Sequence, residues 1–266
     1  MIKIWIQIIP LFALLLTCCS INSQIESDSN KTVKVLSFNI LHGETTQGDF
    51  DLDVLAELIL KANPDLVALQ EVDFMARRSK KYDLATELGW RTKMAPLFGR
   101  AMPFDGGEYG EGILSRFSFV STRNIALPNL PGEEPRAALE IITVLPSGDT
   151  IAFIGTHLSH EGEAGRKIQT QKIREVFSKN KYPTILAGDL NDVPGSDAIN
   201  ILEEIWTPTY DPRDPEPTFP SSSPRIKIDY VMFSPESAWE IVDRQVIQDT
   251  IASDHCAYLV TLRLKH

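Results

Sequence analysis

The sequence has only three cysteines, and two of them, Cys18 and Cys19, lie side by side near the N-terminus. Cys256 is the single cysteine of the predicted domain, which excludes a disulfide within that domain and a zinc site built on cysteines. We favour a buried structural role for Cys256, with a thiol nucleophile paired with His255 as the alternative. Neighbouring residues of a strand point to opposite faces, which disfavours such a pair.

Positive charge is scarce as well. The chain has 26 Lys and Arg residues against 36 Asp and Glu residues, and its formal net charge at pH 7 is -10. Nucleic-acid binding draws much of its strength from Lys and Arg side chains that neutralise phosphates, so this balance disfavours a nucleic-acid partner without excluding one. The one basic cluster is "ARRSKK" at 76–81, for which we favour a solvated loop over a phosphate-binding patch.

The sequence also lacks an unbroken apolar run of the about 20 residues that a transmembrane helix requires. Its first stretch, "MIKIWIQIIPLFALLLTCCS", has one early cation, a shorter apolar run and then small residues, which is typical of a secretory signal. The tetrapeptide Leu-Leu-Thr-Cys resembles a bacterial lipobox and predicts a lipid on Cys18. Cys19 is the alternative site, and an ordinary cleaved signal is the alternative mechanism.

Three segments follow from this reading of the chain. We expect a signal peptide of the lipoprotein type at 1–18, a polar tether at 19–31 and a folded domain at 32–266. The predicted location is the cell envelope, where a lipid anchors the exported protein to a membrane. A secreted or periplasmic protein is the alternative.

Strands dominate the pattern of the predicted domain, and no internal repeat or Gly- or Pro-rich linker interrupts it. Strands are expected at 32–40, 66–72, 111–120, 137–146, 150–158, 184–190, 226–233 and 256–264. Helices are expected at 51–65, 82–90 and 164–179. Short turns join many of the strands, and helices occur only between some of them. This pattern indicates two mostly antiparallel or mixed sheets packed together, with helices outside.

Six of these apolar segments carry polar or ionisable side chains at or near one end. The polar groups are Asn39, Gln70-Glu71, Thr156-His157, Asp189 with Asn191, Asp229, and Ser253-Asp254-His255. Asp and Asn are common in turns because they hydrogen-bond the nearby backbone, so any one of these groups could be turn chemistry. Six together indicate a functional site.

The motifs "SFNI", "ALQEVD", "EYGEGILSR", "GTHL", "GDLND", "IDYVM" and "SDH" occur in this order along the chain. In these motifs the sequence resembles the endonuclease/exonuclease/phosphatase superfamily, which includes DNase I-like nucleases, inositol polyphosphate phosphatases and bacterial sphingomyelinases. The resemblance covers residues 32–264 and implies an α/β fold, the four-layer α/β sandwich of DNase I. In that fold two mixed β-sheets pack face to face, and helices cover both outer faces.

A divalent metal is part of what the resemblance implies. Mg²⁺ takes oxygen ligands, usually one or two carboxylates, and Mn²⁺ or Ca²⁺ are alternatives. Glu71, at the end of a buried strand, is the best direct ligand. Asn39 offers an amide oxygen to the same metal or an amide donor to phosphate. By the family pattern, Asp254 is the second carboxylate that helps to hold the metal.

The same resemblance assigns the acid–base groups. Asp189 orients or deprotonates the attacking water, and Asn191 holds that water or a phosphate oxygen. His255 contacts the phosphate and is held by Asp229, whose carboxylate fixes the imidazole tautomer. His157 protonates the leaving group or contacts phosphate, since imidazole transfers protons near neutral pH.

Tyr109 matches a position at which the family often has a phosphate-contacting residue, and it is the last of the catalytic candidates. The remaining residues are weaker candidates for substrate binding. Arg136 is either an anion contact or a partner of Glu133 or Glu134 in a surface ion pair. His42 and His160 flank the site in sequence and are substrate-contact candidates. Many relatives have Asn in place of Glu111, and a carboxylate there would repel phosphate unless it faces away or meets a cation.

The sequence therefore predicts an exported, metal-dependent hydrolase of phosphoric ester bonds that acts as a monomer on a small, inositol- or lipid-linked phosphodiester or phosphomonoester. Export and the acidic charge both favour such a substrate over nucleic acid. An exported endonuclease or exonuclease is the alternative enzyme. A catalytically silent binding module is the alternative of another class, disfavoured because the residues of the family pattern are present.

Overall fold

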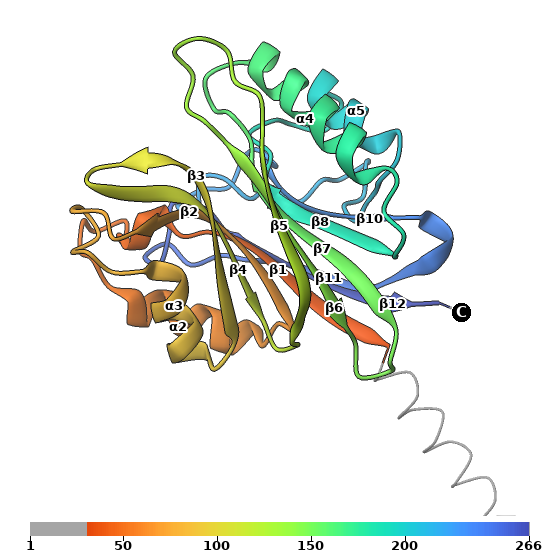
Figure 1. Ribbon diagram of the computed structural model, residues 1–266, viewed down its shortest axis with the longest axis horizontal. Helices are drawn as coiled ribbons and strands as arrows, with labels where there is room; N and C mark the ends of the chain where they lie inside the picture. Colours follow the sequence, from red (N-terminus) through yellow and green to blue (C-terminus); the bar gives the residue numbers. More distant parts are fainter. Residues whose placement is uncertain (1–30, 266) are drawn as a thin grey trace, which may run out of the picture.

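The computed structural model describes residues 31–265, and Figure 1 shows its arrangement. The predicted signal peptide at 1–18 and all of the predicted tether except Lys31 lie outside the described residues. Within residues 31–265, no helix has the length and apolar character needed to cross a membrane.

Two six-stranded mixed sheets form the centre of the structure. The first contains, in spatial order, β11 (Trp239–Ile247), β12 (Ala257–Leu264), β1 (Thr32–Asn39), β2 (Leu66–Phe74), β4 (Gly107–Ser115) and β3 (Ala95–Phe104). The second contains β5 (Phe119–Ala126), β6 (Ala137–Val144), β7 (Thr150–His157), β8 (Thr184–Asp189), β10 (Asp229–Ser234) and β9 (Thr207–Pro208). The pairs β1–β2 and β7–β8 are parallel, and the other described pairs are antiparallel.

Three apolar cores separate four layers. Helices α2 (Leu52–Ala62) and α3 (Leu84–Thr92) pack on the outer face of the first sheet, and α4 (Glu163–Phe177) and α5 (Asp197–Glu203) cover the second sheet on the opposite side (Figure 1). The middle core lies between the two sheets. Two short 3₁₀ helices, η1 (Leu41–Gly43) and η2 (Glu236–Ala238), complete the described elements. The predicted four-layer α/β sandwich is confirmed.

Local sequence explains the boundaries of the helices. Asp51 caps α2, because its Oδ1 accepts hydrogen bonds from the amides of Asp53 and Val54 at 2.9 and 3.4 Å. Asn63 ends α2 in the left-handed conformation with a φ of 51°, directly before Pro64. Asp83 caps α3 in the same way by accepting from the amide of Thr86.

The predicted strand at 111–120 is wrong. The chain leaves the first sheet after β4 and enters the second sheet as β5, so one apolar run supplies two strands in different sheets. Ser115 makes the change of direction through hydrogen bonds to the main chain of Phe117. Strands β3, β9 and β11 and helix α5 were not predicted. These three strands lie at the edges of the sheets, and β11 exposes most of its side chains although five of its nine residues are apolar.

The parallel pairs explain why so many polar groups follow apolar strands. In parallel strands the carboxyl ends lie at the same edge of the sheet. Asn39 at the end of β1 pairs with Gln70 in β2, and His157 at the end of β7 pairs with Asp189 at the end of β8. Asp229 at the start of antiparallel β10 pairs with Asp189 from the other side. Both sheets therefore deliver polar side chains to one end of the sandwich.

Gly188 allows β7 and β8 to approach at this end. A Cβ atom on Gly188 would lie 1.9 Å from the main-chain oxygen of Thr156. We expect Gly188→Ala to lower the free energy of unfolding by about 1–3 kcal/mol or more, because the clash is with backbone that cannot rotate away. Urea denaturation measures this change. Gly155→Ala on β7 is the matched control, since its Cβ would meet Ala68 at an ordinary 3.4 Å. Equal losses in both variants would contradict the explanation.

Lys227 is buried directly before β10. Its Nζ donates to the main-chain oxygen of Asp229 at 2.9 Å and lies 3.5 Å from the centroid of the Tyr258 ring. Burial lowers the pKa of Lys227 to about 7, although the charge of Asp229 opposes the shift. Between pH 7 and the ordinary value of 10.5, the unfolded chain therefore binds more protons at this residue than the folded chain does.

This difference gives Lys227 a measurable effect on stability. The contribution of Lys227 to the free energy of unfolding rises with pH above 7, by at most about 1.4 kcal/mol per pH unit. We expect the free energy of unfolding of Lys227→Met to compare best with that of wild type at pH 7 and below. The comparison should become less favourable to the variant as the pH rises toward 10. Urea denaturation across this range measures it. Lys181→Met removes an exposed lysine that lies over Tyr182 and serves as control. A difference between Lys227→Met and wild type that does not change with pH would refute the expectation.

Candidate active site

The polar strand ends surround a cavity of about 330 Å³. It is lined by ten of the twelve predicted site residues: His42, Glu71, Tyr109, Arg136, His157, His160, Asp189, Asn191, Asp254 and His255. The other two, Asn39 and Asp229, hydrogen-bond to lining residues. A larger cavity of about 840 Å³ lies against α2 and α3 and contains none of the predicted residues, so size alone does not identify the site.

Glu71 is turned into the pocket by an irregularity of β2. The register shifts between Leu69 and Val72, and Glu71 has a φ of 58°, in the left-handed region that non-glycine residues rarely adopt. Its Oε1 accepts from Nδ2 of Asn39, and its Oε2 lies 3.2 Å from Nδ1 of His42. Burial alone would raise the pKa of Glu71, but the hydrogen bonds from His42 and Asn39 outweigh burial and lower it. Glu71 is therefore ionised at neutral pH.

Glu71 and Asp254 form a pair of carboxylates in one pocket. Burial raises the pKa of Asp254; the charge of His255 opposes this shift and that of Glu71 adds to it. A divalent cation between two such oxygen donors would remove their repulsion, and hard oxygen ligands suit Mg²⁺. The donor set therefore fits the predicted metal. Asn39 accepts from the amide of Leu41 through Oδ1 and directs Nδ2 at the acids, so its geometry fits the donor role better than the ligand role.

Asp189 lies at the centre of the site and is almost completely buried. Its Oδ1 accepts from the main-chain amide of Asn191, which has a φ of 50°, and its Oδ2 accepts from Nδ2 of Asn39 at 3.3 Å. The same Oδ2 lies 3.4 Å from Nε2 of His157 and 3.6 Å from Nε2 of His255. Burial raises the pKa of Asp189, and the positive charge of His255 opposes the shift. The end of "ILAGDLND" is thus a hydrogen-bonded turn that also carries the most enclosed acid of the pocket.

His255 is the charged histidine of the pocket. Its Nδ1 lies 3.1 and 3.2 Å from the two carboxylate oxygens of the fully buried Asp229, which is the predicted Asp–His pair. Burial alone would lower the pKa of His255, but the charges of Asp229 and Asp189 outweigh burial and raise the pKa to about 10. Asp189, Asp229 and His255 also place ligand atoms within 4.8 Å of one another. The imidazolium already supplies the positive charge that these two acids require.

His157 has the opposite character. Its Nδ1 lies 3.0 Å from Nη1 of Arg136, and its Nε2 lies 2.9 Å from Nδ2 of Asn191. Burial lowers the pKa of His157 well below its ordinary value, and the positive charge of Arg136 adds to this shift. The ring is neutral at neutral pH. Of the two roles predicted for His157, this environment favours contact with phosphate over donation of a proton.

Arg136 and Tyr109 form the deep wall of the pocket. Arg136 is only 2% exposed, and its Nη1 donates to the hydroxyl of Tyr109 at 3.3 Å. Burial raises the pKa of Tyr109 well above its ordinary value, so the phenol keeps its proton. The alternative of an ion pair with Glu134 is present at 3.2 Å, but it lies in the pocket lining and not at the surface, so Arg136 can be both an ion-pair partner and an anion contact.

Glu111 is the residue that departs from the family pattern. It is fully buried, and neither carboxylate oxygen has a hydrogen-bond partner among residues 31–265. Burial raises the pKa of Glu111 well above its ordinary value. A carboxyl group that stays protonated carries no charge, so it does not repel a phosphate in the neighbouring pocket.

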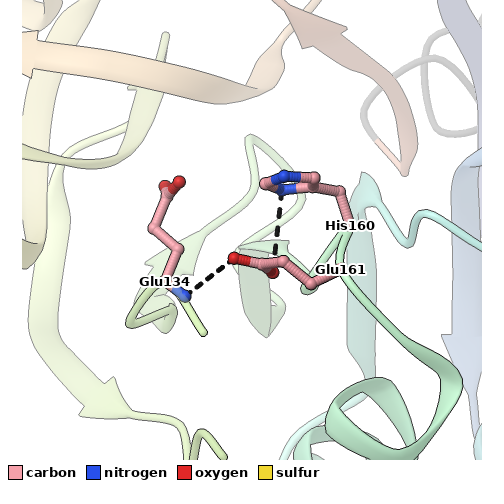
Figure 2. Close-up of side chains that lie close together, drawn as sticks. All are labelled: Glu134, His160 and Glu161. Carbon is pink, nitrogen blue, oxygen red and sulfur yellow. Dashed lines mark hydrogen bonds and ion pairs between the residues drawn. The ribbon is translucent and has the colours of Figure 1, made fainter. Parts of the chain in front are cut away.

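The weaker histidine candidates lie at the rim. His42 sits between Glu71 and Glu44, with Nε2 lying 3.3 Å from Oε2 of Glu44. Figure 2 shows His160 beside Glu161, which also accepts from the main-chain amide of Glu134 at 2.9 Å. Ligand atoms of Glu134, His160 and Glu161 lie close enough together to hold a cation. However, Nη2 of Arg136 lies 3.3 Å from Nδ1 of His160 and brings positive charge to this cluster.

Sequence reasoning missed several residues of the lining. These are Arg78, Met102, Phe104, Glu134 and Phe219. Phe104 belongs to the unpredicted strand β3, and the ring of Phe219 contacts that of His255 in a tilted arrangement with centroids 4.8 Å apart. Arg78 belongs to the basic cluster at 76–81. The phosphate-binding patch that we considered there as an alternative to a solvated loop was the one feature of the sequence that indicated its place in the pocket.

Cys256 is buried and makes no disulfide, as predicted. Burial raises the pKa of its thiol to about 11. The thiol is therefore protonated at neutral pH, which argues against the alternative of a Cys256 nucleophile.

Comparison with solved structures supports the same architecture. An endonuclease/exonuclease/phosphatase from Beutenbergia cavernae is 25% identical with a TM-score of 0.73, over 88% of this chain and 72% of that one. The human Nocturnin catalytic domain, solved with a bound sulfate anion, is 20% identical with a TM-score of 0.69, over 88% and 94%. A mannosyl-6-phosphatase from Bacteroides thetaiotaomicron is 17% identical with a TM-score of 0.69, over 88% and 100%. At these identities the last two show likeness of fold alone.

Sequence comparison gives the family. A comparison with curated proteins finds no significant match. The profile of the Endonuclease/Exonuclease/phosphatase family matches residues 36–255, which span the strand ends that build the pocket. The chain therefore belongs to the endonuclease/exonuclease/phosphatase family.

Proposed function

We propose that the protein is an exported, divalent-metal-dependent phosphoesterase that hydrolyses a small, inositol- or lipid-linked phosphodiester or phosphomonoester. The observation that carries this proposal is the convergence of a carboxylate pair, a buried acid, an imidazolium and a buried guanidinium in one cavity of about 330 Å³. Hydrolysis of a phosphoester needs a base for water and positive charge for the phosphate oxygens. A cavity of this size suits a small head group.

Positive groups on one side of the pocket would bind the phosphate. Arg136 cannot lose its proton at neutral pH, and His255 is held charged by Asp229. Asn191 and neutral His157 are hydrogen-bonded to each other and complete this side. Because these groups are fixed before the substrate arrives, they stabilise negative charge without reorganising during the reaction.

Asp189 is the group that would act on the attacking water. Its Oδ1 accepts from the amide of Asn191 and its Oδ2 from Nδ2 of Asn39, and each carboxylate oxygen can accept a further hydrogen bond, with which it would orient the water and then take its proton. The water oxygen then bonds to phosphorus as the ester oxygen leaves. A base that is buried and has a raised pKa is matched to accepting a proton near neutral pH.

Glu71 and Asp254 are the residues that would hold the metal. When bound, a divalent cation supplies positive charge to the phosphate oxygens and to the leaving oxygen. His42 and Asn39 hydrogen-bond the two oxygens of Glu71 and keep this carboxylate ionised and oriented.

The named relatives are consistent with an anionic substrate. The Nocturnin catalytic domain binds sulfate, and the mannosyl phosphatase is named for a phosphate ester of a sugar. For the present chain, export and a lipid on Cys18 or Cys19 place the substrate outside the cytoplasm in our proposal. We propose that the protein acts as a monomer.

Removal of the metal-binding carboxylate is the first test. Purified protein is offered sphingomyelin, phosphatidylinositol, inositol phosphates and duplex DNA in parallel, with Mg²⁺ or with EDTA. We expect cleavage of a lipid or inositol phosphate that requires Mg²⁺, and at least about a 100-fold loss of turnover in Glu71→Gln. Calorimetric titration with Mg²⁺ should show weaker binding to this variant.

Glu108→Gln is the matched control, because Glu108 pairs with Arg100 at the surface and does not line the pocket. It should retain wild-type turnover. Cleavage of DNA alone would identify a nuclease instead. No cleavage with any divalent metal would favour the silent binding module.

A further inference from the structure

The loop between β2 and α3 carries a positive charge that the proposed reaction does not use. Arg78 lies in this loop and lines the active pocket beside Phe104 and Tyr109. It also lines an adjacent cavity of about 350 Å³, together with His42, Glu44, Gly48, Asp49, Phe50 and Lys80. Arg78 is therefore the guanidinium at the mouth of the pocket, where two cavities meet.

Arg78 is held in one orientation by a buried carboxylate. Its Nε and Nη2 donate to the two oxygens of Asp73, both at 2.8 Å, and Asp73 is fully buried. Two parallel bonds of this kind fix the plane of a guanidinium group. The main-chain amide of Arg78 also donates to Asp105 at 2.8 Å, which fixes the loop.

Two aromatic rings hold the same guanidinium from the side. The Cζ atom of Arg78 lies 4.3 Å from the centroid of Phe104 and 5.5 Å from that of Tyr109, and both rings come from the β3–β4 hairpin. A planar cation stacks favourably on such faces. Arg78 thus has little conformational freedom to lose when a ligand binds.

The binding capacity of Arg78 is not exhausted by these contacts. Its Nη1 has no hydrogen-bond partner in the described part of the chain, and 32% of its side chain is exposed. Asp73 lies behind the guanidinium in the protein interior, so the ion pair presents its positive end outward. Arg78 therefore keeps a donor that its ion pair with Asp73 does not use.

The pocket contains a second arginine at a different depth. Arg136 is only 2% exposed, and its Cζ lies 5.9 Å from the centroid of the same Tyr109 ring. The reacting phosphate needs the deep guanidinium beside His157. Arg78 is a second guanidinium at the mouth of the pocket and contacts the same ring. It is suited to a different anionic group of the same substrate molecule.

We propose that Arg78 binds a second anionic group of the substrate, a phosphate or a carboxylate, so that the enzyme selects phosphoesters that carry two anionic groups. This inference rests on the proposed function, because it takes the pocket around Arg136 as the site of the reacting phosphate. Glu44 and Asp49 line the adjacent cavity together with Lys80, so a longer polyanion that continued past Arg78 would meet two carboxylates against one lysine. The site therefore suits a compact substrate with two anionic groups.

Binding without turnover gives a direct test. The Asp189→Asn substitution prevents hydrolysis, and Mg²⁺ is present throughout. Calorimetry then compares the affinity of this protein for inositol 1,4-bisphosphate with its affinity for inositol 1-phosphate. We expect this protein to bind the bisphosphate about tenfold more tightly, and addition of Arg78→Gln to abolish the preference. Arg77→Gln is the matched control, because Arg77 is its exposed neighbour, pairs with Asp105 and does not line the pocket. It should keep the preference.

Arg78→Gln leaves the buried Asp73 without a cation and can destabilise the fold. The measurement is therefore repeated with Asp73→Asn added to Arg78→Gln, and thermal denaturation verifies folding. Equal affinity for both inositol phosphates, binding of neither, or a preference that survives Arg78→Gln would overturn the inference. If wild-type protein hydrolyses no phosphoester but the preference for the bisphosphate depends on Arg78, the proposed reaction fails and the second anion site stands.

Discussion

The buried carboxylate of Asp189 is the constraint around which the pocket is arranged. It ends the central strand β8, and strands β7 and β10 present His157 and Asp229 at the paired positions on either side. A charge at this depth requires compensation, which Asn39, the amide of Asn191 and the imidazolium of His255 supply. Because these partners come from both sheets, the acid also ties the two halves of the sandwich together at the site.

Two histidines in one cavity receive opposite charge states from their neighbours. His255 faces Asp229 and Asp189 and is held protonated, whereas His157 faces Arg136 and is held neutral. The difference places a fixed positive charge and a neutral ring beside the same oxygen of Asp189. Backbone strain contributes to the same end, since Glu71 and Asn191 both have positive φ angles and orient groups that a regular strand would point elsewhere.

Much of the fold and of the site was predictable because apolar strands with polar ends leave a clear local signal. Asn39 and Asp189 end such strands, Glu71 lies at the register shift within β2, and His255 precedes β12. The edge strands β3 and β11 were missed because a half-exposed strand has no such signal, and the strand at 111–120 was wrong because an apolar run does not show where the chain changes sheets. Arg78 was missed with β3, since its environment depends on Phe104 in that strand.

The sequence by itself determined which chemical groups are available and their order along the chain, and with them the family and its sandwich fold. Only the tertiary structure decided which groups are charged and which face the pocket. The neutral states of Glu111 and His157 follow from burial, and the orientation of Arg78 follows from Asp73 and Phe104. Burial and Coulomb interactions depend on distances between segments far apart in the chain, and local sequence does not encode those distances.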